Sequence, residues 1–405
     1  MTTLGDRLRT LRKQRKLTLE SCAGEQMTKG MLSLIENNKA NPSMENLNYL
    51  AKRLDVDVSE LLEEISGIEL RALLDEAEKL YKSENRECYV KALELIKPII
   101  LKLSRGYESG RLLEIYGRLA FDLKRTDWKD SIEKASVIYD DLNIIPRRAS
   151  VGIFQALVLF TERRYEEALK RLMKERFEIE RKSGYIDALT KLDLDTYEAL
   201  MRFAVNDTEV GTRVMNEAIA YSKKELVFYQ TGQLYRVAAY RAVIDGDEEK
   251  LSYYEQKLIQ YGEFAEDKQA ILYTKTIRIH QLNSFHHNYE EALRRLDSLP
   301  KFSSEDEFFF NFYNLERGKA LYGMARYQEA LEHLKQVMIS DQLHHPFDLS
   351  IFYEKNAYAA LCAEELGDLK TAMELITIAE DNMELMPESP YTLFVKESAR
   401  KLNRK

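Results

Sequence analysis

Apolar positions in the first 66 residues predict five short helices. Leu4, Leu8 and Leu11 recur at helical spacing and give the first helix one buried face. Each of the four later helices begins after a residue with good N-cap chemistry, and the second and third end at good C-terminal residues. The candidate caps are Thr18, Thr28, Ser43 and, for the last helix, Ser59 or Asp57, and the candidate ends are Gly24 and Asn37–Asn38. Five short helices with a tight turn between the second and the third predict a helix-turn-helix DNA-binding domain over residues 1–66.

Residues 17–62 carry a family resemblance. The string LTLESCAGEQMTKGMLSLIENNKANPSMENLNYLAKRLDVDVSELL resembles the phage-repressor (Xre-type) helix-turn-helix, because its apolar, cap and proline positions follow the same order. Two positions depart from that family. Leu19 stands where a phosphate-contacting glutamine is frequent, which removes one phosphate contact. Asn38 stands where glycine is usual, and asparagine tolerates the left-handed backbone that glycine adopts.

The resemblance implies that the third helix enters the major groove of DNA and that its N-terminal residues meet base edges. Lysine donates to guanine, threonine and methionine contact a thymine methyl, serine bonds either way, and glycine lets the backbone approach closely. The expected base contacts are Thr28, Lys29, Gly30, Met31 and Ser33, and the expected phosphate contacts are Arg9, Arg12, Lys13, Lys16 and Lys39. The alternative is a protein-binding module whose charges form an ordinary solvated face.

The remaining residues, 67–405, contain an internal repeat. Tyr-Glu-Glu-Ala-Leu occurs at 165–169 and 289–293 and Tyr-Gln-Glu-Ala-Leu at 327–331, each with a leucine four residues after its alanine. A plain helical bundle does not explain three such copies in phase. With the alanine as the phase marker, eight helix pairs follow at a period of about 40 residues. The markers are Ala92, Ser131, Ala168, Gly211, Leu251, Ala292, Ala330 and Ala372, and SPYTLFVKESARKLNRK is expected to form a polar-faced capping helix.

The copies resemble tetratricopeptide repeats, with Gly318 to Leu334 as the best example. The resemblance implies an all-α fold, in which a five-helix Xre-type domain precedes a right-handed superhelix of about eight helix pairs. The concave groove of such an array suits an extended peptide, because side-chain amides pair with the peptide backbone. The candidate peptide-binding residues are Tyr197, Gln233, Arg236, Tyr240, Gln281, Asn314, Lys319 and Asn356. For each of them the alternative is a plain packing or surface role.

Composition and charge fit this division of the chain. The 405 residues include only 16 glycines and 7 prolines, which is typical of helical arrays. No apolar stretch suits a transmembrane helix or a signal peptide, which favours the cytoplasm. The net charge of −8 by itself argues against nucleic acid, but residues 1–40 carry eight basic and four acidic residues. The three widely spaced cysteines predict neither a disulfide framework nor a zinc site.

The sequence contains no motif for catalysis. A glycine-rich phosphate loop, HExxH, CxxC and a nucleophile elbow are all missing from it. The pairs His286–His287 and His344–His345 lack a third ligand at metal spacing. The aromatic run at 308–313 fits the packed face of a helix. We therefore expect a binding protein, not an enzyme, with no cofactor and no metal.

The two halves together resemble the peptide-pheromone regulators of Gram-positive bacteria, the Rgg/Rap/NprR/PlcR/PrgX group, and most of all its NprR and PlcR branches. The resemblance implies a cytoplasmic quorum-sensing transcription factor with a domain boundary at Ser66–Gly67 and a peptide-binding and dimerisation domain over residues 67–405. Its expected partners are double-stranded operator DNA, a short signalling peptide and a second copy of the chain in a homodimer or higher oligomer, without a membrane. Two alternatives stay open: a Rap-like module that binds a response-regulator protein, and a regulator whose groove serves only dimerisation.

Overall fold

The computed structural model describes residues 3–61, 65–83, 85–303 and 306–404, which form helices joined by turns and contain no β-strand. The chain divides into two compact units, Met1–Val151 and Gly152–Lys405. The predicted all-helical fold is confirmed. Within the described ranges, no helix is both long enough and apolar enough to cross a membrane.

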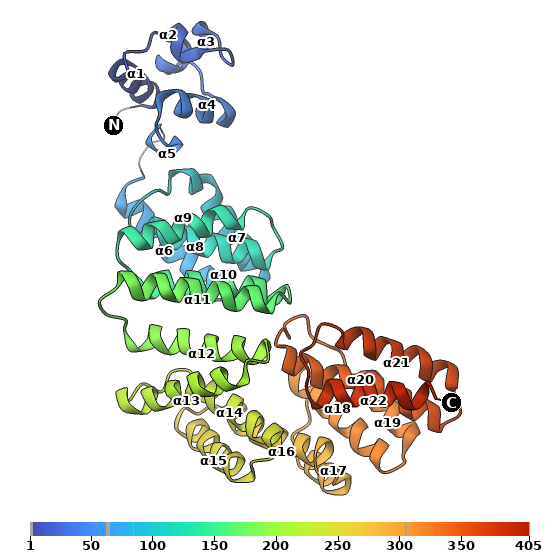
Figure 1. Ribbon diagram of the computed structural model, residues 1–405. Helices are drawn as coiled ribbons and strands as arrows, with labels where there is room; N and C mark the ends of the chain where they lie inside the picture. The colour runs from blue at the N-terminus through green and yellow to red at the C-terminus, as the bar shows by residue number, and fades with distance from the viewer. Residues whose placement is uncertain (1–2, 62–64, 84, 304–305, 405) are drawn as a thin grey trace. The chain divides into compact units, whose positions relative to one another are not determined.

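The first unit begins with the five predicted helices (Figure 1). Thr18, Thr28 and Ser43 cap the second, third and fourth of them, because each side-chain oxygen accepts a hydrogen bond from the backbone N–H three residues later. A shared core buries the apolar faces of these helices. Their bounds are α1 Leu4–Gln14, α2 Leu19–Ala23, α3 Lys29–Glu36, α4 Met44–Leu54 and α5 Val58–Leu61.

The structure locates the start of α5 and the end of α3. The α5 helix begins at Val58, so Ser59 lies inside it and Asp57 occupies the N-cap position. The expected continuation of this helix through residues 62–64 lies outside the described residues. The α3 helix ends at Glu36 with Asn37 as its C-cap, and Asn38 adopts left-handed backbone with φ 56°. Asn38 therefore takes the left-handed conformation that was expected at this position.

Eight helix pairs follow, as the repeat period predicted. The first unit holds α6 Gly67–Tyr81 with α7 Arg86–Ile96, a 3₁₀ helix η1 Lys97–Lys102, and α8 Tyr107–Asp122 with α9 Trp128–Asp141. The helix α10 Ile145–Thr161 contains the boundary between the units and pairs in sequence with α11 Tyr165–Lys182. The second unit continues with α12 Ala188–Ala204, α13 Thr208–Glu225, α14 Thr231–Asp245, α15 Glu248–Phe264, α16 Lys268–Ser284, α17 Tyr289–Asp297, α18 Glu307–Gly323, α19 Tyr327–Gln336, α20 Pro346–Glu365, α21 Leu369–Met383 and α22 Pro390–Leu402.

The phase markers explain why the repeat can be read from the sequence. Every marker lies in the second helix of its pair and is buried. The leucines four residues after the three best alanines, Leu172, Leu296 and Leu334, are buried as well. Gly318 allows its helix to pack closely, since a Cβ atom there would lie 2.6 Å from the Cγ of Leu334. Each pair thus buries small and large residues at fixed positions, as an array of stacked repeats requires.

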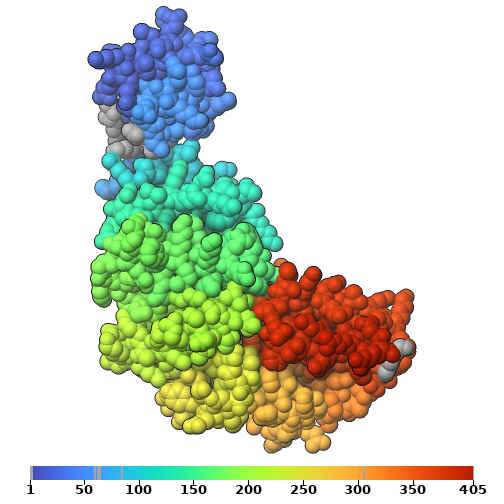
Figure 2. Space-filling view, in the orientation of Figure 1, coloured from blue at the N-terminus to red at the C-terminus, as the bar shows by residue number. Residues whose placement is uncertain are grey.

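The second unit is closed by contacts between segments that are distant in sequence. One hydrophobic core runs through it from α12 to α22. The predicted C-terminal cap is α22, whose Tyr391 is only 1% exposed, so this helix also completes the core. Figure 2 shows the C-terminal residues (red) against residues from the middle of the chain (yellow-green). The C-terminal helix pairs therefore pack against earlier repeats of the same unit.

The predicted domain boundary at Ser66–Gly67 coincides with the start of α6, which Ser66 caps. The compact units divide later, between Val151 and Gly152. One reason is that α5 is in contact with η1, which ties the end of the helix-turn-helix to the first repeat. The extent of the DNA-binding domain, residues 1–66, stays a prediction.

Candidate functional site

The N-terminal turn of α3 presents the residues that were expected to contact bases. Thr28, Lys29 and Gly30 are exposed, whereas Met31 and Ser33 are half-buried. A Cβ atom on Gly30 would meet nothing closer than 3.9 Å, so the fold itself does not require glycine there. This turn is accessible to a partner, and its contacts with DNA stay predictions.

One further residue of α3 is a candidate that the sequence analysis did not select. Leu34 is 46% exposed, although leucine is normally found in the core. The signal was present in the sequence, because Leu34 is out of phase with the buried positions Leu32 and Ile35. An exposed apolar side chain here is suited to contact with a thymine methyl group.

Two arginines that were expected to contact phosphate hold α3 against α1. Arg12 donates from Nε and Nη2 to the two carboxylate oxygens of Glu36 at 2.6 and 2.9 Å, and from Nη1 to the carbonyl of Leu17 at 2.9 Å. Arg9 donates to Oδ1 of Asn37 at 2.5 Å. The Glu36 side chain is 3% exposed, and Arg9 also lies near its carboxylate, with Nε 3.6 Å from Oε2. Both arginines thus have a positioning role within the domain, and their phosphate contacts stay predictions.

The three lysines among the expected phosphate contacts are differently placed. Lys13, Lys16 and Lys39 are exposed, as is Lys29 at the start of α3. Within the described residues, none of these four makes an ion pair. Exposed ammonium groups of this kind can neutralise phosphates without reading sequence.

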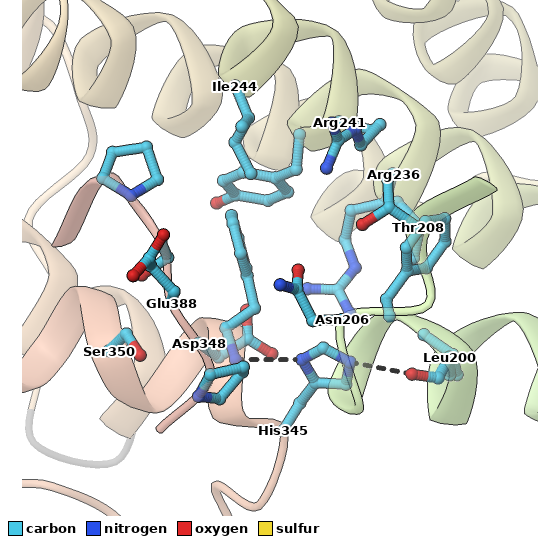
Figure 3. Close-up of a pocket in the computed structure, with 17 residues that line it drawn as sticks. Leu200, Asn206, Thr208, Arg236, Arg241, Ile244, His345, Asp348, Ser350 and Glu388 are labelled. Atoms are coloured by element: carbon cyan, nitrogen blue, oxygen red, sulfur yellow. Dashed lines mark hydrogen bonds between the residues drawn. The ribbon is translucent and has the colours of Figure 1, made fainter. Parts of the chain in front are cut away.

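A groove in the second unit contains half of the expected peptide-binding residues. Two adjoining pockets share the walls Leu200, Arg236, His345 and Asp348. The larger one has a volume of about 850 Å³ including its open mouth, and Arg236 and Tyr240 line it (Figure 3). The smaller one, of about 410 Å³, is lined by Tyr197, Gln233 and Arg236. The structure therefore brings four of the eight residues together around one groove.

The other four expected residues lie elsewhere. Gln281 is buried between Arg278 and Glu248, and Asn314 is buried with His333 as its partner. Asn356 is half-buried and does not line these pockets. Lys319 is fully buried, and its ammonium donates to Glu354 at 2.8 Å and to Ser284 at 2.6 Å. Three of the four thus form internal polar networks, and a peptide contact by any of them stays a prediction.

Beside the groove, three hydrogen bonds join early repeats to late repeats of the second unit. We call this contact the seam. Tyr165 Oη donates to the carbonyl of His344 at 3.0 Å, and Arg163 donates to Tyr353 Oη at 2.7 Å. His345 Nε2 donates to the carbonyl of Leu200 at 3.1 Å, and this bond is drawn in Figure 3. At this seam the pair at 344–345 therefore contributes the backbone carbonyl of His344 and the side chain of His345.

Comparisons with known proteins give a family match for the helix-turn-helix and only distant structural similarity for the longer chain. Residues 8–61 match the helix-turn-helix family. No match was found among curated proteins. The similar solved structures include the competence regulator ComR from Streptococcus vestibularis in its apo form, with 18% identity, a TM-score of 0.33, and 68% of this chain and 96% of that chain covered.

Two further similar structures carry names of the group that the sequence resembles. The SHP pheromone receptor Rgg2 from Streptococcus dysgalactiae is 17% identical, with a TM-score of 0.34 and coverage of 68% of this chain and 98% of that chain. PlcR from Bacillus thuringiensis, in complex with the peptide PapR7 and DNA, is 14% identical, with a TM-score of 0.19 over the full length of both chains. These TM-scores are below the level that indicates a shared fold. The match to the family model is independent of them, and it shows that residues 8–61 are a helix-turn-helix domain.

Proposed function

We propose that the chain is a DNA-binding transcriptional regulator whose DNA binding is switched by a short signalling peptide in the groove of the second unit. One combination of two features carries the proposal. The first turn of α3 is accessible in a helix-turn-helix domain, and the repeat array contains a groove with apolar walls and charged side chains. The order of sequence motifs, which resembles that of peptide-pheromone regulators, supports the same function. Residues 1–66 bind DNA and residues 67–405 bind peptide and form the dimer.

The mechanism is a linkage between two binding events. A peptide that prefers one arrangement of the repeats shifts the population of that arrangement, by no more than its difference in affinity. In a homodimer, two α3 helices that are one turn of DNA apart, about 34–36 Å, read the two halves of a palindromic operator. The groove touches α12, α14 and the start of α20, so an occupant acts on both sides of the seam.

DNA binding is tested by two lysine variants with different expected roles. The full chain is used to select operators from a randomised DNA pool, and binding is then measured by fluorescence anisotropy at several salt concentrations. We expect Lys29→Ala to weaken binding to the preferred sequence by about 1–3 kcal/mol and to relax preference at one base position. Lys13→Ala is expected to weaken binding to all sequences alike and to lower the salt slope by about 1. If the chain shows no sequence preference, or if both variants behave alike, the assigned roles are wrong.

A further inference from the structure

The groove of the second unit contains a cation that forms no ion pair with any described residue. Arg236 lies on α14 and lines both pockets. Its Nε donates to Gln233 Oε1 at 3.3 Å, and its guanidinium lies over the ring of Tyr273 at 5.1 Å from the centroid. Among the described residues, no acid lies within ion-pair distance of it. The two terminal nitrogens of Arg236 are therefore available to a ligand, on a guanidinium that its neighbours hold in place.

The other charged groups of the groove have their charge compensated. Arg241 is paired with Asp245 on its own helix. Asp348 lies in the first turn of α20, where the helix N-terminus stabilises a negative charge. Glu388 is exposed to water at the rim. These placements leave Arg236 as the charge that lacks a counter-charge.

The histidine of the groove adds no charge. Burial lowers the pKa of His345. Its Nε2–H donates to the Leu200 carbonyl and its Nδ1 accepts from the Phe347 N–H at 3.2 Å, so both nitrogens of the neutral ring are satisfied. Figure 3 shows His345, Arg236 and Asp348 around the same space. An anion entering this space meets the Arg236 guanidinium, not an imidazolium.

Next to this cation the larger pocket is apolar. Its walls include Phe203, Tyr240, Ile244 and Phe347. An anionic group on Arg236 thus has room beside it for a large aliphatic or aromatic side chain. The last residue of a peptide joins both features, because its α-carboxylate and its side chain are attached to the same carbon.

We propose that the groove binds its peptide by the C-terminal residue, whose α-carboxylate pairs with Arg236 and whose apolar side chain enters the larger pocket. This inference rests on the proposed function, since it assumes that the groove binds a peptide. Arginine suits the role because its planar fork binds a carboxylate through two parallel hydrogen bonds. Asp348 lies along the same groove and provides an acceptor for the N–H of that terminal residue. An internal residue of a longer chain has no α-carboxylate, so the groove selects free peptide ends.

The test uses synthetic hexapeptides with Leu, Ile, Val, Phe or Trp at the last position, each made as the free acid and as the C-terminal amide. Their binding to the full chain is measured by isothermal titration calorimetry. For the peptides that bind, we expect the acid to bind at least about tenfold more tightly than the amide, which is the usual effect of a hydrogen bond to a charged group. Arg236→Gln is expected to remove this difference, and Arg236→Lys to keep part of it.

The matched control is Arg241→Gln, which removes a cation of the same pocket that already has an internal partner. It is expected to keep the preference for the acid. Equal binding of acid and amide by the unaltered chain overturns the inference and leaves the proposed function standing. If no hexapeptide binds in either form, the proposed peptide function fails, and the inference fails with it. Thermal unfolding of each variant establishes that a lost preference is not a lost fold.

Discussion

Arg12 shows how one residue positions α3, the helix that we propose to read DNA. Its side chain is 12% exposed and makes two hydrogen bonds to a carboxylate that is 3% exposed. Arg12→Ala removes both of these hydrogen bonds and leaves the Glu36 carboxylate only Arg9, whose Nε lies 3.6 Å away. We therefore expect Arg12→Ala to lower the free energy of unfolding by about 1–3 kcal/mol. Hydrogen exchange of the α1 and α3 amides measures this loss directly.

Lys13→Ala is the control, because Lys13 is a neighbouring cation in the same helix but is exposed. If both variants leave the protection of α1 and α3 unchanged, Arg12 does not hold these helices together. The sequence shows that Arg12 is basic, which is why it was assigned to phosphate. It does not show the partner, because Glu36 lies 24 residues away and is brought close only by folding.

The buried charges around Lys319 predict how stability depends on pH. One ammonium faces two carboxylates, with Glu354 at 2.8 Å and Glu316 at 3.4 Å. Burial raises the pKa of Glu354 to about 7 against the opposing effect of Lys319. Burial would also raise the pKa of Glu316, but Lys319 and His280 together lower it to about 2. The two acids therefore affect stability in opposite directions and in different pH ranges.

The direction in which Glu354 changes stability with pH follows from proton binding in the folded and unfolded chain. Between pH 4.5 and about 7, the folded chain keeps a proton on Glu354 that the unfolded chain has lost, so stability falls as the pH rises. Chemical denaturation is expected to show a loss of roughly 1–3 kcal/mol from this group between pH 5 and pH 8. Glu354→Gln is expected to remove that component, and Glu249→Gln, an exposed carboxylate, to keep it. An unchanged pH slope in Glu354→Gln contradicts the assignment.

Among the helices, the small residues of the repeats set how closely each pair packs. A Cβ atom at Gly318 would lie 2.6 Å from Leu334 Cγ, whereas one at Gly184 would meet nothing within 4 Å. Gly318→Ala is expected to lower the free energy of unfolding by about 1–3 kcal/mol through overpacking. Gly184→Ala is the control, and it is expected to have little effect. Thermal unfolding that places both variants at the same midpoint would show that this close approach does not matter.

The order of the helices could be predicted because each repeat buries its marker locally. Ala168, Ala292 and Ala330 are wholly buried at equivalent positions, so the pattern appears in the sequence without knowledge of the fold. The seam could not be predicted. Its bonds join His345 to Leu200 across 145 residues and His344 to Tyr165 across 179, and no local pattern records such pairs.

Only half of the expected peptide-binding residues line the groove, and the reason is related. Polar residues on the first helices of an array face its inner side, which led to Arg236 and Gln233 as well as to Lys319 and Gln281. Whether such a residue faces a ligand or another side chain depends on charges that later repeats contribute. Lys319 meets Glu354 from α20, whereas Arg236 has no such partner among the described residues.

In the whole molecule, the helix-turn-helix belongs to the first unit and the groove to the second. Switching therefore requires that peptide binding in one unit changes DNA affinity in the other, and the change is limited by the coupling free energy between the two sites. The groove is lined by α14 on one side of the seam and by α20 on the other. Peptide binding and DNA binding are thus expected to be linked, and the link is measurable on the full chain.

The most direct test is the affinity of the full chain for its selected operator, measured by fluorescence anisotropy with and without a saturating hexapeptide acid that binds the groove. We predict that the peptide changes the Kd for DNA by at least about fivefold. Arg236→Gln is predicted to lose this change at the same peptide concentration while its peptide-free Kd for DNA stays the same. A peptide that saturates the groove and leaves the Kd for DNA unchanged would contradict the account.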